Sequence, residues 1–168
     1  FTQSVEFTVE LPANVASATV TGAEQTATGW KAKNGAAIAI TYTAAEGYLF
    51  NNKQSTITVN TTAVKGTIAA TDDVKSVTAA EAKIGTVYYL TLQDALDAAT
   101  DDQTVALLKN VTVNAPLTVK SNITLDLNQK SITGDGLAKD AYLVEIGAYE
   151  LTINSTGYLS GIYSDQRG

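Results

Sequence analysis

Asp126 and Glu145 are the residues most able to do chemistry, because they occupy equivalent positions of a candidate repeat. Each lies between apolar neighbours of an expected strand, and a 19-residue step separates them. Neighbouring strands lie about 4.8 Å apart, so stacking would bring the two carboxylates into contact. Such a pair could hold Ca²⁺ with further oxygen ligands, or act as an acid and a base. Like charges in contact destabilise a fold unless a cation intervenes. A structural role in a turn is therefore the first interpretation, calcium the second and catalysis the third.

Aromatic side chains gather late in the chain and are candidates for stacking on sugar rings. We expect Tyr142 in the core, because it shares the alternation of Val144 and Ile146. The candidate glycan-binding residues are Tyr149, Tyr158 and Tyr163.

Composition excludes several classes of chemistry. The chain has no Cys, His or Met, which removes thiol nucleophiles, Ser-His-Asp triads and Cys/His zinc sites. A net charge of −6 argues against a nucleic-acid partner, because binding phosphates needs basic patches. No apolar run approaches the roughly 18 residues that a membrane span needs. We expect no catalytic activity, and no cofactor other than the candidate Ca²⁺. Four N-glycosylation sequons begin at Asn60, Asn110, Asn122 and Asn154.

Residues 1–62 show the pattern of a small all-β domain. Apolar residues alternate with polar ones in several short runs, and Asn34-Gly35 is a strong turn signal. Short strands at regular spacing favour an immunoglobulin-like β-sandwich, with the single Trp30 in its core. Residues 63–80 are expected to be a short tether. The same segment could instead supply one more strand around Gly66–Ile68.

Residues 81–168 begin with the pattern of one short helix. Thr91 is the expected N-cap, with Asp94 as the acidic third residue. Leu92, Leu96 and Ala99 then fall on one face. An amphipathic helix alone in β-rich sequence needs a partner for this face. We expect it to close the open end of a stack of strands, because terminal units need caps.

Apolar positions after the helix recur with a 19-residue step. This register points residues 106/108, 125/127 and 144/146 inward, and residues 107, 126 and 145 outward. A second series follows the same step. Its members are Val113, Ile132 and Leu151. The pattern favours the first turns of a right-handed parallel β-helix, and a second sandwich is the alternative.

Two segments resemble known families. Residues 35–50, GAAIAITYTAAEGYLF, resemble a segment common in repeats of bacterial surface proteins. Residues 87–134 include TLQDALDAA, TVALLKNVT and ITLDLNQKSITG. They resemble the opening turns of pectate-lyase-like β-helices in bacterial surface proteins, except that Gln129 stands where that family usually has Gly. We therefore expect a slightly different turn there. The family includes adhesins, secreted carbohydrate-active proteins and fibre or spike proteins of bacterial viruses.

The resemblance implies an extracellular habitat, on a bacterial cell surface or a phage virion. The chain starts at Phe1 and stops at Gly168, which we interpret as cuts through a longer protein. The expected function is a non-catalytic structural or binding module, an adhesin or fibre that displays a stiff rod. Expected partners are a carbohydrate or a host surface ligand, with a homo-oligomer as a further candidate. The alternative is the N-terminal part of a secreted polysaccharide lyase or glycoside hydrolase, with its active groove on later turns.

Overall fold

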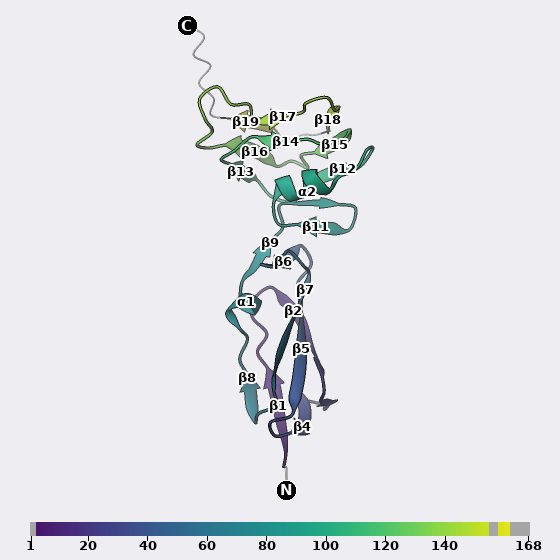
Figure 1. Cartoon of the computed structure of the whole chain (residues 1–168), viewed down its shortest axis with the longest axis vertical. Coiled ribbons are helices and arrows are strands. Elements are labelled where there is room, and N and C mark those ends of the chain that lie inside the picture. Colours follow the sequence, from purple (N-terminus) through teal and green to yellow (C-terminus); the bar gives the residue numbers. More distant parts are fainter. Residues whose placement is uncertain (1–2, 155–157, 162–168) are drawn as a thin grey trace. The chain divides into compact units, whose positions relative to one another are not determined.

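The computed structural model describes residues 3–154 and 158–161, and in these residues the chain is predominantly β (Figure 1). The chain divides into two compact units, Phe1–Ala79 and Ala80–Gly168. Within the described residues, no helix is both long and apolar enough to cross a membrane.

The first unit contains two main sheets that share one hydrophobic core. One has the strand order β3-β4-β1-β8 and the other β2-β5-β7, while β6 and β9 form a small separate pair. The elements are β1 (Ser4–Val9), β2 (Val15–Thr21), β3 (Glu24–Gln25), β4 (Trp30–Lys33), β5 (Ala37–Ala44), β6 (Tyr48–Phe50), β7 (Thr56–Thr62), β8 (Gly66–Ile68), α1 (Asp72–Lys75) and β9 (Val77–Ala79).

Alternation along the central strand β5 builds this core. Ile38, Ile40 and Tyr42 are buried on one face, as the sequence pattern predicts. Phe7 of β1 packs into the same cluster from the other sheet. Trp30 is partly buried and stacks on Phe7, with ring centroids 6.3 Å apart. Trp30 is therefore a packing residue, as expected.

The expected tether at residues 63–80 is wrong, and the alternative of one more strand at Gly66–Ile68 is confirmed. This segment supplies β8, which pairs in parallel with β1, and β9, which pairs with β6. Between them, Thr71 caps α1 and Val74 is completely buried in the core. The segment joins the unit because its isolated apolar residues fill the core, and the first unit extends to Ala79.

Glu10 fastens this segment to the end of β1. Its Oε2 accepts a hydrogen bond from the Ala70 backbone N–H at 2.8 Å and lies 3.5 Å from Lys75 Nζ. The Ala70 bond lowers the pKa of Glu10, and the charge of Lys75 acts in the same direction. Burial raises the pKa of Tyr42, and the nearby charge of Glu10 raises it further.

The second unit begins with a hairpin and a helix and continues as a stack of short strands. Its elements are β10 (Ala82–Ile84), β11 (Val87–Tyr89), α2 (Leu92–Ala98), β12 (Thr104–Leu107), β13 (Val111–Val113), β14 (Leu117–Thr118), β15 (Ile123–Asp126), β16 (Ser131–Gly134), β17 (Val144–Glu145), β18 (Leu151–Asn154) and β19 (Tyr158–Gly161). We call β12–β19 the strand stack. Its parallel ladders are β12-β15-β18, β13-β16-β19 and β14-β17, so the chain visits three sheets in turn and then returns to the first.

The expected 19-residue register is wrong. Val105 pairs with Leu125 and Leu125 pairs with Ile153, so the first step is slightly longer than expected and the second is much longer. Val105 and Leu107 are therefore completely buried in the first turn, in place of residues 106 and 108. The inward placement of Leu125 and Leu127 is confirmed, since each is 1% exposed. Ile146, expected inward, is 39% exposed. Unequal loops cause the error, because they change the step from one turn to the next.

The helix is confirmed, and it packs against the first turn of the stack. Thr91 Oγ1 accepts a hydrogen bond from the Asp94 N–H, and Glu81 Oε2 accepts one from the Leu92 N–H. The buried face of α2 belongs to the same core as β12 and β15. Its buried members are Leu92, Ala95 and Leu96, with Ala99 just beyond the helix.

Gln93 of α2 pairs with the backbone of β14. Its amide accepts a hydrogen bond from the Thr118 N–H at 2.9 Å and donates one to the Thr118 carbonyl at 3.1 Å. The Gln93 amide thus takes the place of a neighbouring strand, which would pair with the same backbone N–H and C=O groups. The antiparallel strand β10 pairs with the corresponding edge of β12. The hairpin and helix thus cover these two edges of the first turn, which limits unwanted strand pairing there.

Candidate functional site

The proposed carboxylate pair does not form. Asp126 lies on β15, where its partners are Ala106 and Asn154, whereas Glu145 lies on β17 opposite Thr118. The two residues belong to different sheets because the true steps differ from the expected one. Asp126 Oδ1 accepts a hydrogen bond from the Asn128 N–H at 2.9 Å, which is the structural turn role considered first. Within the described residues, no group of three or more acidic side chains is placed to hold a metal ion.

The candidate tyrosines have different outcomes. Tyr149 is 47% exposed, as a glycan-contacting residue must be. Tyr158 begins β19 opposite Ser131, but its side chain lies outside the described part of the structure, and Tyr163 lies outside the described residues altogether. Tyr142 is 74% exposed, so its expected core position is wrong. It precedes β17 and is not part of a strand, so strand alternation does not apply to it.

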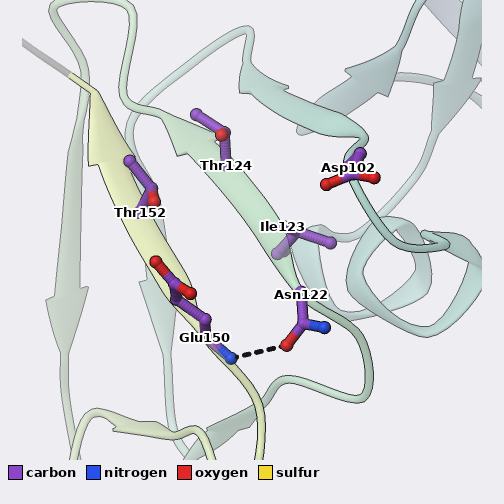
Figure 2. Close-up of a pocket in the computed structure, with 6 residues that line it drawn as sticks. All are labelled: Asp102, Asn122, Ile123, Thr124, Glu150 and Thr152. Carbon is purple, nitrogen blue, oxygen red and sulfur yellow. Dashed lines mark hydrogen bonds between the residues drawn. The ribbon is translucent and has the colours of Figure 1, made fainter.

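A shallow hollow of about 130 Å³ lies on the surface of the second unit where successive turns begin (Figure 2). Asp102 comes from the turn before β12. The middle of the hollow is formed by Asn122 and the first residues of β15, and Glu150 lies just before β18. The lining residues are Asp102, Asn122, Ile123, Thr124, Glu150 and Thr152.

Hydrogen bonds between the segments position the backbone that carries these side chains. The Asp102 N–H donates to the Asn122 carbonyl at 2.8 Å, and the left-handed backbone of Asp102 (φ 66°) forms the turn. Asn122 Oδ1 accepts from the Glu150 N–H at 2.9 Å (Figure 2), and the Glu150 carbonyl accepts from the Ile123 N–H at 3.1 Å. These hydrogen bonds thus connect the three chain segments that line the hollow.

Hydroxyl groups continue from the hollow along the outer face. Thr104, Thr124 and Thr152 are register partners on β12, β15 and β18, and none of the three is buried. Figure 2 shows the Thr124 and Thr152 side chains on neighbouring strands beside the hollow. Neighbouring strands lie about 4.8 Å apart, so this row offers hydrogen-bonding groups at regular intervals.

The chemistry of the hollow suits a ligand rich in hydroxyl groups. Its lining combines two carboxylates, one amide and two hydroxyls, and none of the six lining residues is a lysine or arginine. Carboxylates accept hydrogen bonds strongly, whereas a ligand with its own negative charge would be repelled. The arrangement therefore favours neutral or cationic polar ligands over anionic ones.

Sequence reasoning missed this hollow. No motif of the sequence singled out Asp102, and Asn122 stood out only as the start of a sequon. The contributing segments follow one another at unequal intervals, so no single period connects them. Polar residues immediately before successive strands were the one available signal.

Comparison with known proteins gives no relatives: no protein-family model, curated protein or solved structure matches this chain.

Proposed function

We propose that this chain is a non-catalytic module of a larger extracellular protein, and that it contacts carbohydrate through the hollow of the second unit. In this proposal the first unit is an immunoglobulin-like sandwich, and the strand stack is the opening of a right-handed parallel β-helix on a cell surface or virion. The repeated passage through three parallel ladders supports the assignment of the stack. The helix-capped first turn supports it as well.

The hollow is the observation that carries the proposed binding function. Its polar side chains come from three successive turns, and hydrogen bonds between the turns fix the backbone that carries them. Sugar hydroxyls both donate and accept hydrogen bonds, so they match a lining of carboxylates, amide and hydroxyls. Polar groups on a backbone that is already ordered lose less entropy on binding than groups on a mobile segment. Exposed Tyr149 immediately precedes Glu150 and adds an aromatic surface in the same loop.

A glycan-binding experiment tests the proposal. The whole chain is titrated with neutral, amino and uronic-acid oligosaccharides, and binding is followed by calorimetry or ligand NMR. We expect neutral or amino sugars to bind, and Glu150→Gln to weaken binding about tenfold, because a hydrogen bond to a charged group contributes about 1.5–3 kcal/mol. Glu145→Gln is the matched control, since Glu145 is exposed and lies outside the hollow.

Three results would contradict the proposal. The first is no binding of any sugar class, and the second is an equal loss of affinity in both glutamate variants. The third is cleavage of an acidic polysaccharide by the isolated chain. That result would favour the alternative function, the N-terminal part of a secreted lyase or hydrolase.

A further inference from the structure

A groove of about 220 Å³ lies on the second unit and shares no residue with the hollow. It lies between the start of α2 and the loop that joins β13 to β14, and Glu81, just before β10, forms another part of its lining. A water molecule occupies about 30 Å³ in the liquid, so the groove has room for one side chain rather than for a large ligand. We call it the α2 groove.

The lining of the α2 groove combines an apolar surface with a single charge. Glu81 is the one charged residue among the ten residues that line it. The apolar members of the lining are Leu92, Val113, Ala115, Pro116 and Leu117. Binding sites for small groups commonly have this composition, in which a few polar atoms fix the orientation of a ligand. The negative charge of Glu81 favours a cation, because no positive side chain of the lining neutralises it.

Hydrogen bonds hold Glu81 in place and leave one of its carboxylate oxygens for a ligand. The Glu81 N–H donates to the Tyr89 carbonyl at 3.0 Å, and the Glu81 carbonyl accepts from the Leu108 N–H at 2.9 Å. Glu81 Oε2 accepts from the Leu92 N–H at 2.8 Å. Within the described part of the chain, no hydrogen bond or ion pair engages Glu81 Oε1. The carboxylate is therefore positioned, and Oε1 can still accept a hydrogen bond.

The polar side chains beside this carboxylate are already engaged. Gln93 uses its amide on the Thr118 backbone and on Asp97. Thr91 Oγ1 accepts from the Asp94 N–H at 3.0 Å. A sugar would bring several hydroxyl groups that find few partners on this lining, whereas a methylene stem needs none. The α2 groove thus differs in chemistry from the hollow, which is lined mostly by polar side chains.

We propose that the α2 groove binds a lysine side chain of a protein partner. The methylene stem lies on the apolar lining, and the ammonium group donates to Glu81 Oε1. Lysine fits better than arginine, because the Leu92 N–H already occupies one carboxylate oxygen and a guanidinium group pairs best with two. An apolar side chain of similar length would lack the hydrogen bond to the charged group.

A titration of the whole chain with blocked amino acids tests the proposal. N-acetyl-lysine N-methylamide is added to isotope-labelled protein, and the amide signals are followed by NMR. The Leu92 N–H reports directly on the groove, because it donates to Glu81. The norleucine derivative has a similar stem without the charge, and the arginine derivative carries a guanidinium group. We expect the lysine derivative to bind at least about fivefold more tightly than either, because it alone makes a well-fitted hydrogen bond to the carboxylate.

Glu81→Gln removes the charge but keeps an oxygen that can accept from the Leu92 N–H. This variant should bind the lysine derivative no more tightly than the norleucine derivative. Glu145→Gln is the matched control, because Glu145 is exposed and does not line the groove, and it should bind the lysine derivative like the wild type. The comparison of lysine with norleucine uses the wild-type chain, so it decides the question even where Glu81→Gln impairs folding.

Four results would each overturn the proposal. They are no response of the Leu92 signal to the lysine derivative, equal affinity for the norleucine or arginine derivative, an equal loss of affinity in both glutamate variants, and an equal response of the Leu92 signal to glucosamine. The last result would assign the groove to amino sugars. Binding at the hollow is followed separately through the Glu150 amide, which donates to Asn122, so failure of this proposal is distinguishable from failure of the proposed function.

Discussion

Gln93→Ala tests how the helix covers the edge of the strand stack. The substitution removes the amide that pairs with both backbone groups of Thr118. It also removes a 3.0 Å hydrogen bond between Gln93 and Asp97. The helix itself should survive, because alanine has the highest helix propensity. The loss therefore reports on the contact between α2 and β14.

The expected loss of stability in Gln93→Ala depends on how deeply the Thr118 backbone is buried. A buried backbone group that loses its partner costs about 1–3 kcal/mol. Thr118 is half-buried, so water can reach it in part and the lower half of that range applies. At about 1–2 kcal/mol for each group, the two groups together should cost about 2–4 kcal/mol. For a unit of this size, that loss lowers Tm by roughly 10 °C or more.

Lys120→Ala is the matched control, because Lys120 follows β14 and contacts Asp97 of α2. Lys120 Nζ lies 2.6 Å from Asp97 Oδ1, which is shorter than either Gln93 bond to the Thr118 backbone. Both side chains are largely exposed, at 60% and 43%. Exposed ion pairs contribute about 0–1 kcal/mol, so the control should cost much less despite its shorter distance.

The assay must separate the two units, because a chain with two units need not unfold in one step. Trp30 is the only tryptophan and lies in the first unit, so its fluorescence follows that unit alone. Hydrogen exchange of peptides covering residues 104–126 follows the second unit. Gln93→Ala should speed exchange there and leave the Trp30 transition unchanged. The reasoning is refuted if Gln93→Ala destabilises the second unit no more than Lys120→Ala does. It is also refuted if Gln93→Ala destabilises the first unit, followed by Trp30 fluorescence, as much as the second.

Three further predictions follow from register, charge and backbone geometry. Val105→Asp should unfold the second unit in a thermal melt, because it buries an unpaired charge, whereas Ala106→Asp should be tolerated; equal effects would contradict the observed register. Glu10→Gln should make the first unit less sensitive to acid: the pKa of Glu10 is lowered from 4.5 on folding, so its stabilising contribution is present above pH 4.5 and disappears as pH falls through the folded-state value. An unchanged pH profile of the Trp30 transition would count against this role. Gln129→Gly should stabilise the second unit by about 1 kcal/mol in urea unfolding, because a left-handed φ of 59° is unfavourable for glutamine but not for glycine. A loss of stability in this variant would refute the prediction.

The backbone of the turn at Gln129 gives the reason for the last of these predictions. The sequence departs from the family pattern at this position, and a different turn is expected. In the structure Asn128 and Gln129 are both left-handed, and the Lys130 N–H donates to the Leu127 carbonyl at 2.8 Å. Gln129 thus adopts a left-handed conformation that glycine favours, and it does so with strain.

Local features of the sequence determined the parts of the fold that depend on neighbouring residues. The α2 helix could be predicted because its cap, Thr91, and its apolar face lie together within one short segment, 91–99. Alternation placed Ile40 and Leu125 in the core for the same reason, since strand geometry fixes which side chains share a face. The division into two units was also predictable, although its boundary was not.

Only the tertiary structure decided which distant segments pair. Residues 66–68 became β8 by pairing with β1, near the start of the chain, and no local pattern encodes that partner. The register of the stack depended on loop lengths, which make the second step longer than the first and separate Asp126 from Glu145. The same unequal steps bring Asp102, Asn122 and Glu150 to one hollow. Side-chain alternation is set within a strand, whereas pairing between strands is set by the whole core.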